Sequence, residues 1–311
     1  MNLTDEEKYL LDHVHSQINK SNLSEALITL YDGIKEIYKH SSKEHWNKFI
    51  SEYRQHHISS VFLQDPFIRR AFEKPRGYAG DAVMMDFIYA LDGIVPPPFE
   101  DKELEIGKKL YYEFNRLSLA CNAVRERRRI LSKKIDQTSE RVSNPYILSV
   151  ACGHLREVLD SLAVKNKAIG KYVIIDQDKE SLSVAAELIK DFGEFIPASV
   201  LDIIKGKIPI SGFDFVYTAG LYDYLPDKIS IKLTVKLFNL LNPGGRLLIA
   251  NFLPNIPCIG FMEAVGDWWL IYRNKEQMQE LISKIPKEHI NNVDIFVEKN
   301  QNIIFVEIEK K

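Results

Sequence analysis

Gly153 and Asp176 are the two residues whose types and spacing first suggest a chemical site. Each follows an apolar run, residues 147–151 before the glycine and 173–175 before the acid. They lie 23 positions apart, close to the roughly 20 expected between a tight cofactor-binding turn and the acid that binds a ribose. The pattern therefore predicts a nucleotide-cofactor site. The turn holds one glycine where a nicotinamide fingerprint holds three, a mismatch that the rest of the chain has to explain.

Two carboxylates beside two tryptophans form a second candidate. Glu263 and Asp267 are four positions apart, so they would share one face of a helix. Burial against the indoles of Trp268 and Trp269 would raise a carboxyl pKa and suit general-base chemistry. The alternative is an amphipathic helix with the tryptophans in the core and the acids in solvent.

A third candidate is the segment 72–81, which contains two glycines, a proline and four charged residues and is poor helix material. Gly77 and Gly80 are expected to need a positive φ or a close backbone approach. An ordered loop that carries Arg76, Tyr78 and Asp81 could close over a bound cofactor as a lid. A solvated turn between helices is the alternative.

Composition and charge restrict the class of protein. The 311 residues carry a net charge of -2, with 45% hydrophobic and 27% charged residues, as in a soluble globular protein. No excess of positive charge is available to neutralise phosphates, so we expect no nucleic-acid partner. The first residues lack the regions of a signal peptide, and no apolar run approaches the ~18 residues of a membrane span. We therefore expect a cytoplasmic protein without a membrane partner.

The cysteines predict neither a disulfide framework nor a metal site. Cys121, Cys152 and Cys258 are too few and too scattered for either. Cys152 lies in the turn itself, where we expect a small packing residue, with a reactive thiol as the alternative.

The elements that must position these residues fall into two parts. Capping-box spacing at Thr4–Glu7 and at Ser41–Glu44, followed by apolar stripes, predicts helices in the first part, including a long one over about 104–135. From Asn144 on, apolar strands alternate with helical patterns, which indicates a parallel sheet covered on both faces. The strands are expected at 146–151, 172–176, 195–200, 213–218 and 246–252, with a β-hairpin at 293–298 and 303–308. We expect a helical domain over residues 1–140 and an α/β domain over 141–311.

Residues ~140–311 resemble the class I S-adenosylmethionine-dependent methyltransferases. The resemblance rests on the order of elements, the first turn, Asp176, the Asn-Pro-Gly-Gly sequence at 242–245 and the terminal hairpin. It implies an α/β fold with a Rossmann-like methyltransferase sheet, mostly parallel with a C-terminal antiparallel hairpin, joined to an all-helical N-terminal domain. It also implies S-adenosyl-L-methionine as the cofactor, which needs fewer close backbone approaches than a dinucleotide.

The family pattern implies a set of cofactor contacts. An acid is followed by three glycines at alternate positions, and here Ser149 stands for the acid and Leu155 for the last glycine. Ser149 cannot supply a carboxylate to the cofactor's ammonium group, and Asp81 could supply it instead. For Asp176 a helix cap is the alternative role, and for Asp202 a plain turn residue. The implied cofactor-binding residues are Tyr78, Asp81, Ala151, Gly153, His154, Asp176, Gln177, Asp202 and Ala219.

The methyl acceptor is expected at the loops after the fourth and fifth strands, because ligands of open α/β sheets lie beyond the carboxyl ends of the strands. The first loop is not of the Asn-Pro-Pro-Tyr type that resembles amino methyltransferases of nucleic-acid bases and glutamine. A basic run at 125–129 could reach an anionic acceptor through Arg125 or Arg128, or it could be a solvated helix face. The candidate catalytic residues are Tyr222, Asp223, Glu263 and Asp267, with packing and capping as alternative roles. The candidate acceptor-binding residues are Arg76, Arg125, Trp268, Tyr272 and Arg273.

The leading hypothesis is a methyltransferase that acts on a small-molecule acceptor at an oxygen, carboxylate or hydroxyl. The sequences at 74–81, 219–225 and 267–273 resemble a bacterial methyltransferase subgroup, some members of which make methyl esters of 3-hydroxy fatty acid signals. A carbon or nitrogen acceptor, a protein or RNA substrate, and a non-catalytic S-adenosylmethionine-binding protein remain alternatives. The sequence leaves open whether the protein is a monomer or a homodimer.

Overall fold

The computed structural model describes residues 3–311 and divides them into two compact units. The helical unit comprises the chain up to Asn122 together with Asn255–Trp269, and the sheet unit comprises Ala123–Pro254 and Leu270–Lys311. The sequence places the boundary near residue 140, whereas the compact units divide at Asn122 and the first unit takes in a late segment. Each unit is described by itself.

The helical unit is built from amphipathic helices. Thr4 caps the first helix as its spacing predicts, because its Oγ1 accepts the Glu7 N–H at 3.2 Å while Glu7 Oε2 accepts the Thr4 N–H at 2.8 Å. The cap expected at Ser41 is wrong by one residue, since Ser42 accepts the His45 N–H. The helices are α1 Asp5–Asn19, α2 Leu23–His40, α3 Lys43–Gln55, α4 His57–Phe62, α5 Pro66–Glu73, α6 Ala82–Ala90, α7 Glu105–Leu117 and α13 Ile259–Ala264.

The single long helix expected over about 104–135 is two helices. α7 ends at Leu117, and α8 Leu119–Arg141 begins after Ser118. The backbone of Ser118 is extended, with φ -67° and ψ 115°, and its Oγ accepts the Cys121 N–H at 3.3 Å. A serine in this conformation caps the helix that follows, which breaks the helical pattern without a proline or glycine.

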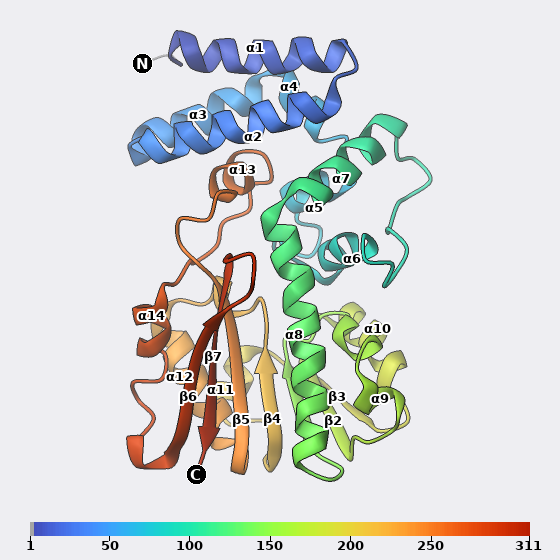
Figure 1. The fold of residues 1–311 in the computed structure, drawn as a ribbon, viewed down its shortest axis with the longest axis vertical. Helices are drawn as coiled ribbons and strands as arrows, with labels where there is room; N and C mark the ends of the chain where they lie inside the picture. The colour runs from blue at the N-terminus through green and yellow to red at the C-terminus, as the bar shows by residue number, and fades with distance from the viewer. Residues whose placement is uncertain (1–2) are drawn as a thin grey trace. The chain divides into compact units, whose positions relative to one another are not determined.

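The sheet unit contains seven strands in the order β3-β2-β1-β4-β5-β7-β6 (Figure 1). β1 pairs in parallel with β2 and β4, and the last pairs, β5 with β7 and β7 with β6, are antiparallel. This confirms the expected mostly parallel sheet with an antiparallel hairpin at its end. The strands are β1 Tyr146–Val150, β2 Lys171–Asp176, β3 Gly193–Pro197, β4 Phe213–Thr218, β5 Leu241–Phe252, β6 Ile290–Val297 and β7 Ile303–Lys310.

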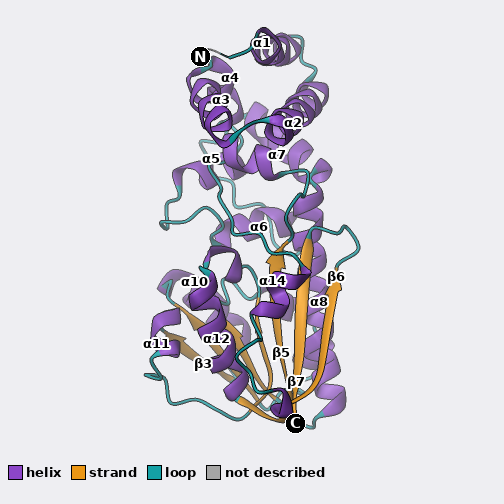
Figure 2. Cartoon of the chain, turned by 90° about the vertical axis from the view of Figure 1, so that its left-hand side faces the viewer, coloured by secondary structure: helices purple, strands orange, loops and turns teal. Residues whose placement is uncertain are grey.

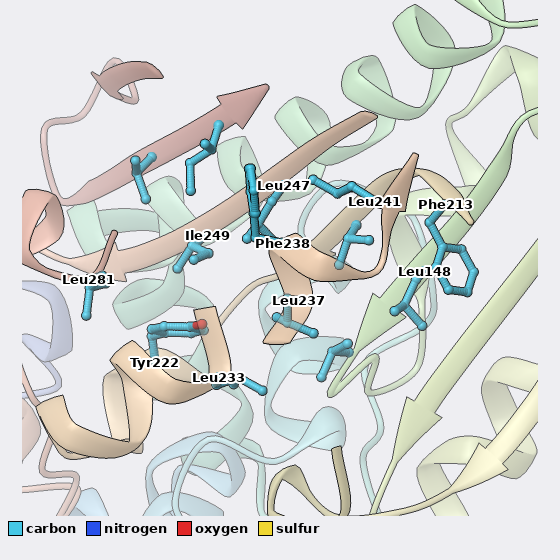
Figure 3. Close-up of a cluster of buried hydrophobic side chains, with 14 of the residues drawn as sticks. Leu148, Phe213, Tyr222, Leu233, Leu237, Phe238, Leu241, Leu247, Ile249 and Leu281 are labelled. Atoms are coloured by element: carbon cyan, nitrogen blue, oxygen red, sulfur yellow. The ribbon is translucent and has the colours of Figure 1, made fainter. Parts of the chain in front are cut away.

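Helices cover both faces of the sheet (Figure 2). On one face, the strands pack against α11, α12 and α14 in a cluster that includes Leu148, Leu233 and Ile249 (Figure 3). On the other face α8 lies along the sheet, where its Lys134 pairs with Glu307 of β7. The remaining helices are η1 Arg156–Leu159, α9 Leu162–Lys165, α10 Lys179–Ile189, α11 Val200–Ile204, η2 Tyr222–Tyr224, α12 Asp227–Asn239, α14 Lys275–Glu280 and η3 Lys287–His289.

The Asn-Pro-Gly-Gly turn forms the start of β5 and depends on its glycines. Gly244 has φ +73°, and a Cβ on Gly245 would lie 2.7 Å from the carbonyl oxygen of Phe213. A side chain at either position would strain the turn or push β4 away from β5.

Within residues 3–311, no helix combines the length and apolar character needed to cross a membrane. The same residues contain no group of three or more histidine, cysteine or acidic side chains arranged to hold a metal ion.

Candidate functional site

The turn after β1 keeps the backbone of a glycine-rich turn although it holds one glycine. Ala151, Gly153 and Leu155 have φ values of +54°, +54° and +53°. This left-handed region favours glycine, and a side chain there costs roughly 1–2 kcal/mol. All three positions that the family pattern fills with glycine therefore retain the conformation that glycine would adopt.

A short 3-10 helix follows the turn, in place of the regular helix that the sequence predicts. η1 spans Arg156–Leu159, and α9 adds four residues after Ser161. Leu155 is buried, so its side chain packs in the interior while its backbone stays left-handed. His154, one of the implied cofactor-binding residues, is buried in the turn itself.

Asp176 lies at the end of β2 and is hydrogen-bonded to the turn. Its Oδ2 accepts the Gly153 N–H at 2.9 Å, and its Oδ1 accepts the Asp178 N–H at 2.9 Å. Burial raises the pKa of Asp176, and these backbone donors oppose the shift. Asp178 caps α10 by accepting the Glu180 N–H, so the capping role, which was the alternative for Asp176, does not fall to Asp176. Asp176 is thus a carboxylate held beside the turn, with the exposed Gln177 next to it.

The pKa of Cys152 is affected by two carboxylates near this turn. Burial raises the pKa of Cys152 well above its usual value, and the charges of Asp176 and Glu157 raise it further. A thiol in these surroundings is protonated and unreactive, which fits the packing role that the sequence predicts.

Glu157 is a buried acid for which the sequence predicted no role. The Tyr217 hydroxyl donates to Glu157 Oε1 at 2.5 Å, and the hydroxyls of Tyr217 and Tyr172 lie 2.6 Å apart. Burial raises the pKa of Glu157, while the Tyr217 hydrogen bond and the charges of Arg127 and Arg128 lower it. One sequence signal could have marked it: Arg156 and Glu157 are a charged pair directly after the turn, followed by two apolar residues.

Asp223 lies in the loop after β4, as the sequence predicts for a residue near the acceptor. Its Oδ1 accepts the Phe252 N–H at 2.7 Å, which joins this loop to the end of β5. Burial raises the pKa of Asp223 to about 6, against the opposing effects of that hydrogen bond and of Arg127 and Arg273. A carboxylate with this pKa can accept a proton at neutral pH.

Tyr222 lies within the hydrophobic core cluster (Figure 3). Its side chain is fully buried, and its hydroxyl lies 2.9 Å from Thr234 Oγ1. Burial raises the pKa of the phenol above its usual value. This position favours the packing role that the sequence kept as the alternative, and it does not favour a role as base.

Arg273 connects the loops after β4 and β5. Its guanidinium donates to Asp227 Oδ1, to Asn251 Oδ1 and to the carbonyl oxygen of Tyr222 at 2.7–2.8 Å. The side chain is 1% exposed. These bonds give Arg273 a structural role, and they do not favour the predicted contact to an acceptor. The neighbouring Tyr272 is half-buried.

The basic run on α8 is not a solvated face. Arg125, Arg127 and Arg128 are all buried, and only Arg129 among the four arginines is exposed. Arg128 pairs with Asp160. Arg127 covers the loop after β4, because its Nη1 lies 3.3 Å from where a Cβ on Gly220 would be. The sequence singled out Arg125 and Arg128 and missed Arg127, whose charge acts on both Glu157 and Asp223.

In the helical unit, Glu263 and Asp267 do not share a helix face, because α13 ends at Ala264 and Asp267 has φ +47°. Glu263 Oε2 accepts from the Trp46 indole at 2.8 Å, and burial raises the pKa of Glu263. Asp267 pairs with Arg54 at 2.7 Å and also with Lys74. These contacts fix the segment 255–269 within its unit. Trp268 is buried but Trp269 is half-exposed, so the two tryptophans do not share the predicted core position.

Asp81 acts as a helix cap. Its Oδ1 accepts the Met84 N–H at 2.9 Å, and its carboxylate pairs with Arg70 at 2.7 Å. These contacts satisfy the carboxylate within the helical unit, which does not favour the predicted contact to an ammonium group. Gly77 has the expected positive φ, whereas Gly80 does not. Arg76 and Tyr78, the other lid candidates, are partly exposed.

Asp202 lies in the first turn of α11, so it is not the plain turn residue that the sequence kept as the alternative. It forms a capping box with Ser199 at the start of α11 and pairs with Lys207 at 2.8 Å. The hydrogen bonds from Lys207 and Ser199 hold the pKa of Asp202 below its usual value.

The candidate site at the carboxyl ends of β1, β2 and β4 is a smaller set of residues than the sequence predicted. It consists of Ala151, Gly153, His154, Asp176, Ala219 and Asp223, together with Glu157 and Arg127, which the sequence did not predict.

Comparisons with known proteins find solved structures whose fold is similar to that of this chain. No family model and no curated protein matches its sequence. A possible exported protein from Bordetella parapertussis is 17% identical, with a TM-score of 0.58 over 74% of this chain and 79% of that one. Magnesium protoporphyrin IX methyltransferase from Synechocystis PCC 6803, solved with SAH bound, is 9% identical, with a TM-score of 0.46 over 74% and 100%. N-methyltransferase NodS from Bradyrhizobium japonicum WM9 is 12% identical, with a TM-score of 0.41 over 58% and 95%.

The pairing of the strands, and not these likenesses, identifies the fold. A mostly parallel sheet that ends in an antiparallel hairpin, here in the order β3-β2-β1-β4-β5-β7-β6, is the sheet that the class I methyltransferase resemblance implies. The chain therefore has the fold of the class I S-adenosylmethionine-dependent methyltransferases.

Proposed function

We propose that this protein is an S-adenosylmethionine-dependent methyltransferase that acts on a small-molecule acceptor, with an oxygen as the acceptor atom. The single observation that carries the proposal is the turn at residues 151–155. It keeps a left-handed backbone at three alternate positions and binds the Asp176 carboxylate through the Gly153 N–H at 2.9 Å. Strained backbone of this kind persists at ligand sites, where the surrounding structure maintains it.

The residues at the carboxyl edge of the sheet fit this cofactor. Asp176 has two carboxylate oxygens, which can accept the ribose hydroxyls in addition to their backbone donors. The ligand is a cation, and the turn is flanked by two buried carboxylates, Asp176 and Glu157. The retained conformation of the turn supports cofactor binding despite the missing glycines, whose loss was the motive for the non-catalytic alternative.

When bound, S-adenosylmethionine supplies an electrophilic methyl group on a sulfonium. The protein aligns the acceptor, excludes water and, for a hydroxyl acceptor, takes up a proton. Asp223 is the residue placed for that proton, since it is buried in the loop after β4 and its pKa is about 6. A carboxylate acceptor needs no base, and the charge of Arg127 beside the same loop would favour an anion there. The subgroup resemblance implies this second class of acceptor, with a methyl ester as product.

The proposal is tested by incubation with methyl-labelled S-adenosylmethionine and a fractionated metabolite extract. We expect the label in a small acidic or hydroxylated metabolite, formed together with S-adenosylhomocysteine. Label in protein or RNA would favour the alternative substrate classes. An absence of cofactor binding by calorimetry would refute the proposal.

A further inference from the structure

Glu157 forms a buried hydrogen-bonded network with Tyr217 and Tyr172. This network lies on one side of the turn, and Asp176 lies on the other. Tyr217, the partner of Glu157, is the next-to-last residue of β4, whereas Asp176 ends β2. Because β1 lies between β2 and β4 in the sheet, the turn that follows β1 separates the two carboxylates along the carboxyl edge. Both act on the Cys152 thiol in the middle of the turn.

This order fixes which part of a bound nucleoside would meet Glu157, if the proposed function holds. With the ribose at Asp176, one arm of the cofactor extends toward β3 and the other toward β1 and β4. The methyl group has to reach the loops after β4 and β5, so the arm that carries it, the amino-acid arm, lies toward β4. That arm also carries an ammonium group.

Ser149 and Glu157 are linked through the same tyrosine. Ser149 is the partner of Tyr217 in the pairing of β1 with β4, and the Tyr217 hydroxyl donates to Glu157. Ser149 has no charge to offer a cation. Glu157 reaches the same face of the sheet from η1 and does carry a carboxylate. Arg127 and Arg128 favour its ionised form although it is buried.

We propose that Glu157 binds the ammonium group of the cofactor's amino-acid arm, in the role that position 149 cannot fill. This inference rests on the proposed function. A buried carboxylate without a full counter-charge is unfavourable, and an ammonium ion that forms charge-assisted hydrogen bonds with it recovers the lost free energy. Tyr217 is a positioning residue, because its hydroxyl fixes Oε1 of Glu157.

Three nucleosides test this assignment by calorimetry on the full-length protein. S-adenosylmethionine and S-adenosylhomocysteine both carry the ammonium group, whereas 5′-methylthioadenosine lacks the amino-acid arm. Glu157→Gln is expected to weaken the first two by roughly ten- to a hundredfold, the range for a hydrogen bond to a charged group, and to leave methylthioadenosine within about twofold of wild type. Tyr217→Phe should give a smaller loss with the same selectivity. Glu187→Gln, which removes an exposed charge from α10 of the same unit, is the matched control and should change none of the three.

The outcomes separate the inference from the proposed function. Unchanged affinity of Glu157→Gln for S-adenosylmethionine would overturn the inference, and so would an equal loss of all three nucleosides, which indicates a structural role in the turn. Retained binding of methylthioadenosine shows that the variant is folded. A second readout is proton release on S-adenosylmethionine binding, measured in buffers of different ionisation enthalpy, which should decrease in Glu157→Gln. Wild-type protein that binds none of the three would refute the proposed function itself.

Discussion

The left-handed turn predicts that glycine is the more stable residue at both position 151 and position 153, so that reverse substitutions at the two positions have opposite effects. At Ala151, φ +54° costs roughly 1–2 kcal/mol for a side chain. Glycine removes that strain but loses about 0.5–1 kcal/mol in chain entropy. Ala151→Gly should therefore stabilise the protein by about 0.5–1 kcal/mol, and Gly153→Ala, at the same φ, should destabilise it by a similar amount.

Leu155 has the same backbone conformation but a buried side chain. Leu155→Gly relieves the strain and also removes a core side chain whose truncation costs about 2–5 kcal/mol, so a net loss of about 2–4 kcal/mol is expected. Ala185→Gly, in the interior of α10 where φ is not positive, is the control and should destabilise by about 1 kcal/mol.

Urea unfolding followed by circular dichroism measures these free energies. The slope of the transition has to be the same in all variants for the midpoints to be compared. If Ala151→Gly destabilised the protein as much as Ala185→Gly does, position 151 would not be left-handed and the account of the turn would be wrong.

Three further predictions concern Asp176, Tyr222 and Asp223. Asp176→Ala should weaken S-adenosylmethionine binding by over ~10-fold with the fold intact; wild-type calorimetric affinity would remove the ribose assignment. Tyr222→Phe should leave turnover within about twofold and lower stability by about 1 kcal/mol through the lost bond to Thr234; a large fall in turnover with unchanged unfolding would restore Tyr222 as a base. If Asp223 is the base, turnover should rise with pH through about 6, because only the ionised form accepts a proton; Asp223→Asn should lose this limb, and an unchanged pH profile would place the base elsewhere.

The same carboxyl makes stability depend on pH. The pKa of Asp223 is about 6 in the folded state, against 3.8 for an aspartate in an unstructured peptide, so the unfolded chain releases this proton at lower pH than the folded one. The contribution of Asp223 to stability is therefore present below the lower value and is lost as the pH rises through the window between the two, by on the order of 2–3 kcal/mol. Asp223→Asn removes this dependence.

The fold could be predicted from the sequence because its signals are local and repeated. The strands alternate with helices, Asp176 follows its strand directly, and the glycines at 244 and 245 mark the turn into β5. The interruption at Ser118 could not be predicted in the same way. The pattern of apolar residues continues through that serine, and only its capping of Cys121 separates α7 from α8.

The role of a candidate site residue could be predicted where it depends on neighbours in the sequence, and not where it depends on partners from distant parts of the chain. Asp176 and Asp178 could be distinguished from sequence, because the second is better placed to cap α10. Glu263, Asp267 and Asp81 have the residue types of catalytic groups, but their partners Trp46, Arg54 and Arg70 come from other helices. No spacing along the chain reveals such a pairing, and the pairing is what makes these acids structural.

The arginines of α8 also have partners that no spacing along the chain reveals. Their pattern is typical of exposed residues, but three of the four are buried. A run of four arginines within five residues is typical of a solvated face, since buried charge is costly unless it is paired. Here the sheet unit supplies the partners: Asp160 for Arg128, and the carboxylates of Glu157 and Asp223 near Arg127. The charge of the buried Arg127 thus opposes the burial that raises the pKa of both acids. Removing that charge in Arg127→Leu should raise both pKa values together, so the pH at which turnover rises should increase and cofactor affinity near neutral pH should fall in the same variant.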